Sequence, residues 1–186
     1  MQRFDFSPTT IAGLMLVQRK RLEDPRGFLS RLYSAEEFGA AGSAKGISQI
    51  NQTFTRRMGA VRGIHFQLPP HAETKFVSCL RGEIFDVAVD VRRGSPTFLK
   101  WHAEVLSAKN QRSLLIPEGF AHGFQALDDD CEVLYLHTAP YSQASESALN
   151  VLDPALAISW PLEITEMSDR DRGHAMLTAA FDGIDP

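Results

Sequence analysis

The sequence has few cysteines, no long apolar run and no excess of positive charge. Its 186 residues include two cysteines, Cys79 and Cys131, which lie in strand-like runs and are too few for a disulfide framework; we expect buried, reduced thiols. The apolar runs have the length of strands, whereas a membrane span needs roughly 20 residues. A net charge of -4 excludes a broad basic surface, so we expect no nucleic-acid partner. The N-terminal residues lack an apolar stretch followed by a cleavage site, which predicts a cytoplasmic protein.

The body of the chain has the pattern of an all-β domain. Short apolar segments alternate with Gly, Pro and Asp, which is typical of a sandwich or barrel. We expect strands at about 47–53, 60–67, 74–80, 83–92, 100–107, 112–116, 123–127 and 131–138. Neither a repeat nor a shift in composition marks a second domain, so a single domain is expected over residues 1–186.

The flanking segments add short peripheral elements. Residues 14–17 and 28–33 are strand-like, with a turn between them at 24–27. Ser34 and Glu37 have the spacing of a capping box and predict a short helix, for which Gly39 is a plausible end. Residues 168–181 begin with a serine and acids and predict a C-terminal helical segment.

Polar residues that could take part in catalysis occur on three of the expected strands. In a regular strand over 61–67, Arg62 points to one face and His65 to the other. In 85–91 the alternation places Asp86 opposite a row of apolar residues, which indicates a polar cavity rather than a uniform core. His122 follows between glycines, and Tyr135 lies in the last of these strands.

Histidine, lysine, tyrosine and aspartate together suit proton transfer without a metal. Each of them taken alone is more often a satisfied core or surface group, and their joint appearance on neighbouring strands favours an active site. A metal site on such strands needs two histidines one residue apart, but the position two after His65 is Gln67, and His71 follows two prolines in a turn. His102 and His174 are expected at the surface. For His137 the sequence leaves two positions open, one at the mouth of the cavity and one away from it.

Several motifs in a fixed order resemble one enzyme family. The chain is similar to the dTDP-4-dehydrorhamnose 3,5-epimerases, the RmlC-type cupins, from about Asp24 to Asp171. The resemblance implies a cupin jelly-roll barrel with short peripheral helices, a homodimer with swapped N-terminal strands, and no metal or organic cofactor. The motifs are Arg62-Gly63-Ile64-His65-Phe66-Gln67, Lys75, residues 82–92, 95–98 and 106–110, and Ile116 to Phe124.

The resemblance also implies a role for individual residues. His65 corresponds to the catalytic base and Asp171 to its partner, Lys75 to the group that stabilises an enolate oxygen, and Tyr135 to the acid on the opposite face of the sugar. Asp86 and His122 correspond to a further pair at the cavity. The remaining substrate contacts implied by the resemblance are Arg26, Gln49, Asn51, Arg62, Tyr141 and Arg170.

The chain departs from the family pattern at Arg31, Ser78 and Leu136, and by one extra residue between Asn51 and Arg62. None of these departures removes a catalytic group. The expected reaction is epimerisation at C3 and C5 of a nucleoside-diphosphate 4-keto-6-deoxyhexose, with a dTDP-linked sugar as substrate. There are four alternatives: an enzyme that inverts C3 alone, an epimerase for another nucleotide sugar, a binding protein without catalysis, and a metal-dependent dioxygenase.

Overall fold

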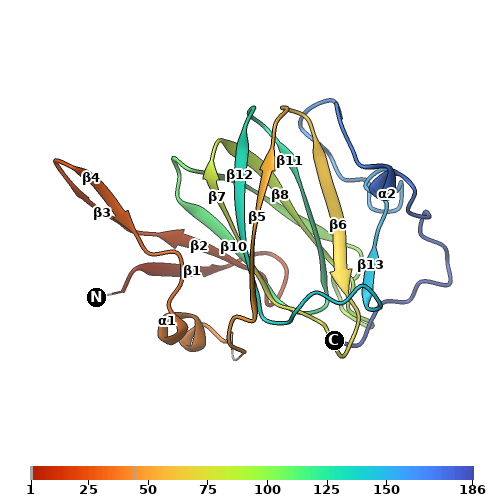
Figure 1. Ribbon diagram of the computed structural model, residues 1–186. Coiled ribbons are helices and arrows are strands. Elements are labelled where there is room, and N and C mark those ends of the chain that lie inside the picture. Colours follow the sequence, from red (N-terminus) through yellow and green to blue (C-terminus); the bar gives the residue numbers. More distant parts are fainter. Residues whose placement is uncertain (1, 44) are drawn as a thin grey trace.

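The computed structural model describes residues 2–43 and 45–186 and consists of two antiparallel sheets packed face to face, with a hairpin that projects from the body (Figure 1). One sheet has the order β1-β2-β10-β7-β12-β5 and the other the order β13-β6-β11-β8-β9, while β3 and β4 form the hairpin. The predicted all-β class is confirmed, and the eight strands expected between 47 and 138 all occur within three residues of their expected ends.

The strands and helices have the following bounds, given in chain order. The elements are β1 Phe4–Pro8, β2 Met15–Arg19, β3 Arg21–Asp24, β4 Gly27–Ser30, α1 Ala35–Ala40, β5 Gln49–Thr55, β6 Val61–Gln67, β7 Lys75–Arg81, β8 Glu83–Asp90, β9 Trp101–Ser107, β10 Arg112–Ile116, β11 Phe120–Ala126, β12 Cys131–His137, β13 Glu146–Ala148 and α2 Asp169–Arg172.

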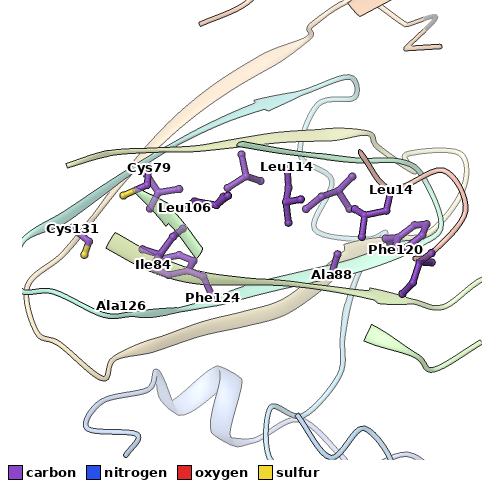
Figure 2. Close-up of a cluster of buried hydrophobic side chains, with 14 residues drawn as sticks. Leu14, Cys79, Ile84, Ala88, Leu106, Leu114, Phe120, Phe124, Ala126 and Cys131 are labelled. Carbon is purple, nitrogen blue, oxygen red and sulfur yellow. The ribbon is translucent and has the colours of Figure 1, made fainter. Parts of the chain in front are cut away.

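The main core lies between the two sheets. Figure 2 shows side chains of both sheets pointing toward each other, among them Leu114 from β10 and Phe124 from β11. Cys79 and Cys131 are buried here as free thiols, as predicted. Since successive side chains of a strand point to opposite faces, the same strands also supply a second, outer layer.

The outer face of the six-stranded sheet is covered by α1. Phe38 of this helix packs against Phe4 and Phe76, with ring centroids 5.2 and 4.6 Å away. The side chain of Ser34 caps α1 by accepting the N–H of Glu37, as predicted. The carboxylate of Glu37 accepts the N–H groups of residues 3 and 4 instead of completing a capping box. The helix also continues past Gly39 to Ala40, so the predicted end is wrong; the carbonyls of the last turn are met by the N–H groups of residues 41–43.

The outer face of the five-stranded sheet is covered by the chain after β13. The indole N–H groups of Trp101 and Trp160 donate to backbone carbonyls of this segment, and Gln125 exchanges hydrogen bonds with Leu162. The predicted helix over 168–181 is wrong beyond residue 172. Gly173 ends the helix, and the next residues run in irregular conformation across the sheet. In the part of the chain described, no helix is both long and apolar enough for a membrane crossing.

Candidate active site

A cavity of about 890 Å³ opens between the two sheets. Strands β5, β7 and β12 line it from one sheet, and β6 and β11 from the other. Further walls come from Tyr141, from Glu146 of β13, and from residues 166–168, 170 and 171. Its volume lies in the range of cavities that hold small organic ligands.

His65 on β6 forms a close pair with Asp171 on α2. The Nε2 atom of His65 is 2.7 Å from Oδ1 of Asp171, whose Oδ2 accepts the N–H of Gly63 at 3.4 Å. Burial alone would raise the pKa of the Asp171 carboxyl, but the hydrogen bond and charge of His65 hold it below its usual value. A carboxylate at Nε2 favours a proton there in the neutral ring, so Nδ1 carries the lone pair. The pair is thus equipped to act as a base with a fixed tautomer.

A β-bulge brings Arg62 to the same side of the sheet as His65. Within the β6–β11 pairing His65 lies opposite His122 and Arg62 opposite Phe124, so two residues of β6 face one residue of β11. Gly63, with a φ of +122°, occupies the bulge. The prediction that Arg62 and His65 point to opposite faces is therefore wrong, because it assumed a regular strand. Both residues line the cavity.

Lys75 begins β7 and reaches across to the other sheet. Its Nζ donates to the backbone carbonyl of His65 at 3.0 Å and lies 3.2 Å from Oε1 of Glu73. The side chain is only 8% exposed. An ammonium has three hydrogens, so these two acceptors leave one for a ligand in the cavity.

Tyr135 lies on β12, in the sheet opposite His65. Its ring meets His122 edge-on at 5.8 Å and stacks on His137 at 6.0 Å. Burial raises the pKa of the Tyr135 phenol, and the charge of Asp86 raises it further. The phenol is therefore protonated at neutral pH, as an acid catalyst must be.

Opposite Tyr135, on β11 and β8 of the five-stranded sheet, His122 and Asp86 form a second histidine–carboxylate pair. Their Nε2 and Oδ1 atoms are 2.7 Å apart. Only His122 lines the cavity, since Asp86 is fully buried beneath it. Burial raises the pKa of the Asp86 carboxyl, against the opposing charge and hydrogen bond of His122.

The rim of the cavity carries two arginines and a tyrosine. Oε2 of Glu146 accepts hydrogen bonds from Arg170 and from the hydroxyl of Tyr141, both at 3.0 Å. Arg62 is fixed by bonds to the hydroxyl of Thr55 and the carbonyl of residue 54. Together with Lys75, these arginines suit an anionic ligand.

Asn51 lines the cavity, whereas two other expected contacts lie elsewhere in the single chain. Gln49 supports the rim, because it donates to Asn51 and accepts the N–H of Tyr141. Arg26 lies at the tip of the β3–β4 hairpin, 88% exposed and paired with Asp24.

The three departures from the family pattern lie outside the cavity. Arg31 is paired with Glu37 near α1, and the hydroxyl of Ser78 bonds Ser113 on the neighbouring strand. Leu136 packs in the outer apolar layer, since it alternates with Tyr135. None of the three side chains is among those that line the cavity.

Sequence reasoning missed three polar residues at this site. Glu73 precedes Lys75 by two residues, the spacing that places side chains on one face of an extended chain, and this was the available signal. Glu146 gave no signal in the sequence. His174, expected at the surface, is partly buried with 25% of its side chain exposed, and its Nε2 lies 3.9 Å from Oδ1 of Asp171. His137, left open by the sequence, lines the cavity.

The one group of potential metal ligands found among the described residues includes both members of the His65–Asp171 pair. Ligand atoms of His65, Asp171 and His174 lie within 4.8 Å of one another, close enough to surround a cation. Two of these atoms, Nε2 of His65 and Oδ1 of Asp171, already bond each other. A metal-free site stays a prediction, and metal analysis of the purified protein tests it.

Comparisons with known proteins agree on one enzyme family. The family model described as dTDP-4-dehydrorhamnose 3,5-epimerase matches residues 8–179. An enzyme of that name from Sinorhizobium fredii is 41% identical over 92% of this chain and 89% of its own length. A dTDP-4-dehydrorhamnose 3-epimerase from Streptomyces niveus is 38% identical over 94% of this chain and 84% of its own length.

Solved structures show the same likeness. The 3,5-epimerase from Bacillus anthracis with TDP and PPi bound superposes with a TM-score of 0.90, at 36% identity over 94% of this chain and 99% of that chain. RmlC from Legionella pneumophila in complex with dTDP-4-keto-L-rhamnose gives a TM-score of 0.86, at 39% identity over 90% of this chain and 89% of that chain.

Proposed function

Because the chain belongs to the dTDP-4-dehydrorhamnose 3,5-epimerase family, we propose that it converts dTDP-4-dehydro-6-deoxy-D-glucose to dTDP-4-dehydro-L-rhamnose by inverting C3 and C5. The observation that carries this proposal is the placement of the acid–base groups. His65 comes from one sheet, Lys75 and Tyr135 come from the other, and all three line one cavity. A base and an acid from opposed walls are what inversion at carbon requires.

The first step is removal of a proton from carbon. Hydrogens at C3 and C5 lie α to the C4 carbonyl, so a base can remove either if the resulting enolate is stabilised. Nδ1 of His65 takes the proton, and Asp171 stabilises the imidazolium. The ammonium of Lys75 donates to the oxygen as charge develops there; such preorganised donors contribute about 3–4 kcal/mol in other enzymes.

The second step returns a proton to the other face of the ring. Tyr135 gives its phenolic proton to the enolate carbon, the C4 carbonyl re-forms, and the configuration is inverted. The imidazolium of His65 loses its proton to solvent, and the phenolate of Tyr135 regains one. A turn of the sugar presents the second carbon to the same groups.

The diphosphate is assigned to the cationic rim. Arg62 and Arg170 offer the planar donors that bind phosphate oxygens in pairs. The relatives crystallised with TDP or a dTDP-sugar support a nucleoside diphosphate ligand.

Proton exchange in heavy water tests the assignment directly. In D₂O, wild-type protein should replace the C3 and C5 protons of the substrate with deuterium and yield the rhamno product, both followed by NMR. Replacing Tyr135 by phenylalanine should abolish net inversion because the returning proton is lost. Wild-type protein that bound the sugar nucleotide without exchanging either proton would be a binding protein rather than an enzyme.

Inversion at C3 alone is the second candidate. The similar protein from Streptomyces niveus is named a 3-epimerase, and a 3'-monoepimerase from Streptomyces bikiniensis has a similar structure with a TM-score of 0.85. The same NMR experiment separates the candidates, because a C3-specific enzyme leaves the proton at C5 in place throughout turnover.

The proposal includes a cytoplasmic homodimer in which the β3–β4 hairpin lies against a second copy. Phe28 and Leu29 of this hairpin are 57% and 62% exposed, although they are large and apolar. A hairpin that projects from the body supports burial by a partner (Figure 1). The same contact would carry Arg26 toward the partner's substrate. Light scattering that returned a monomer mass would refute this part of the proposal.

A further inference from the structure

A buried carboxylate, Glu73, connects the two groups that the six-stranded sheet supplies to the reaction. Its Oε1 is 3.2 Å from Nζ of Lys75, and its Oε2 is 2.9 Å from Nδ1 of His137. The three side chains are between 8% and 11% exposed. The ring of His137 stacks on that of Tyr135, with an interplanar angle of 15°. Neighbouring groups therefore lead from the ammonium through Glu73 and His137 to the ring of Tyr135, with 6.0 Å between the centroids of the last two rings.

The backbone fixes this arrangement at the ends of β7 and β12. Lys75 lies opposite His137 in the strand register. One position further, the N–H of Thr74 donates to the hydroxyl of Thr138 at 2.8 Å, and the N–H of Thr138 donates to the carbonyl of Thr74 at 3.1 Å. Glu73 is therefore held next to both of its partners before any ligand enters.

The charges of the three groups complement each other. Burial alone would raise the pKa of the Glu73 carboxyl, but the hydrogen bond from His137 and the charge of Lys75 hold it below its usual value. A carboxylate that accepts Nδ1–H of an imidazole fixes the tautomer and the orientation of the ring. Glu73 thus sets both the location of a cation and the plane of an aromatic ring.

We propose that Glu73 and His137 are positioning residues, Glu73 holding the ammonium of Lys75 at the enolate oxygen and His137 holding the ring of Tyr135 against the carbon that it protonates. This inference rests on the epimerase function proposed above. One carboxylate would then position both the group that stabilises the enolate oxygen and, through His137, the group that protonates the carbon. Neither residue touches the reacting atoms in this scheme.

Replacing Glu73 by glutamine tests the proposal with little change in volume. We expect kcat to fall by about ten- to a hundredfold, below the loss from removing a direct donor, and KM to stay within about threefold. Loss of the carboxylate also removes one negative charge beside the ammonium and the imidazole, so the pH profile of kcat should differ from that of the wild-type protein. The other titratable groups facing this network, His65, His122 and Tyr135, are unchanged in this variant.

The matched control is Glu104→Gln. Glu104 on β9 is 19% exposed and lies 3.3 Å from Nε2 of His102, so it forms a histidine–carboxylate pair outside the cavity. Its replacement should leave kcat and the pH profile unchanged.

A readout without substrate separates this inference from the proposed function. In ¹⁵N NMR of the ligand-free protein, the imidazole of His137 should show a single Nδ1–H tautomer. The pattern should change in Glu73→Gln and persist in Glu104→Gln. If Glu73→Gln does not fold, His137→Phe is the second variant, because it keeps the stacked ring but loses the bond to Glu73; a reduced kcat is expected again.

Two results would overturn the inference. One is a wild-type kcat and pH profile in both Glu73→Gln and His137→Phe; the other is a His137 spectrum that does not change in Glu73→Gln. If instead wild-type protein does not act on the sugar nucleotide, the proposed function fails, while the spectrum still decides whether Glu73 orders His137.

Discussion

Replacing Asp171 by asparagine removes one charge from the proposed catalytic pair of His65 and Asp171 with little change in the size of the side chain. In the wild-type protein Oδ1 of Asp171 faces Nε2 of His65 and Oδ2 faces the N–H of Gly63. An asparagine amide has only one acceptor oxygen. If that oxygen stays with Gly63, its NH₂ group faces His65, Nε2 must accept, and the imidazole proton moves to Nδ1, the atom that should remove the substrate proton.

The expected loss follows from the geometry. A hydrogen bond between a carboxylate and a cationic partner contributes roughly 1.5–3 kcal/mol. The transition state carries the developing imidazolium, so its barrier rises by a similar amount. The wrong tautomer adds to this loss, and we therefore expect kcat to fall by about 10²- to 10³-fold.

The assay is NMR in D₂O, with Asp169→Asn as the matched control. Asp169 is an exposed acid two residues away in the same helix, and its replacement should leave exchange unchanged. Exchange at C3 and C5 should slow together with product formation, since both begin with His65. A kcat within about threefold of wild type for Asp171→Asn, or an equal loss in Asp169→Asn, would refute the dyad argument.

Three further predictions concern stability. Gly63→Ala should destabilise the fold by a few kcal/mol, because a Cβ there would lie 2.5 Å from a backbone Cα of β11 and the residue has a φ of +122°. Gly46→Ala is the control, since its Cβ would point into open space and should cost little. Urea unfolding compares the two variants, and equal midpoints would contradict the bulge. Burial alone would raise the pKa of the Asp90 carboxyl, but hydrogen bonds, first of all from Arg92, lower it to about 2. Because this pKa lies below the unfolded value, Asp90 stabilises the fold by roughly 1–2 kcal/mol at neutral pH, and this contribution is lost as pH falls from about 4 toward 2. Asp90→Asn should therefore unfold at lower urea than wild type at pH 7 and by a smaller margin near pH 3; a constant margin would count against the linkage. Phe38→Ala should cost about 3–5 kcal/mol, as its ring is fully enclosed in the outer layer, and a change below 1 kcal/mol would show that α1 does not pack there.

The strands between 47 and 138 were predictable because alternation of side chains is a local property. The motif around Asp86 illustrates this: its apolar and polar faces were assigned correctly from the sequence, and Asp86 is buried beneath the cavity. The motifs also identified the family and the four proposed catalytic residues. Local signals failed at the C-terminus, where Gly173 ends a helix that composition had extended to 181.

Arg62 shows why the rest of the site could not be predicted. In a regular strand it would point away from His65, and only the pairing of β6 with β11 reveals the extra residue that turns it into the cavity. The same holds for Glu73 and His137, which are 64 residues apart and meet because β7 and β12 are neighbours.

By itself, the sequence determined the class of fold and the family, and it pointed to the residues proposed here as acid, base and ammonium, because these depend on residue types and their spacing along the chain. The tertiary structure alone decided which groups share a wall and which lie on opposed walls, how Lys75 is held and that Arg26 lies away from its own cavity. The physical reason is that hydrogen bonds and charges act over a few ångströms in space, and strand pairing, not chain distance, sets those separations.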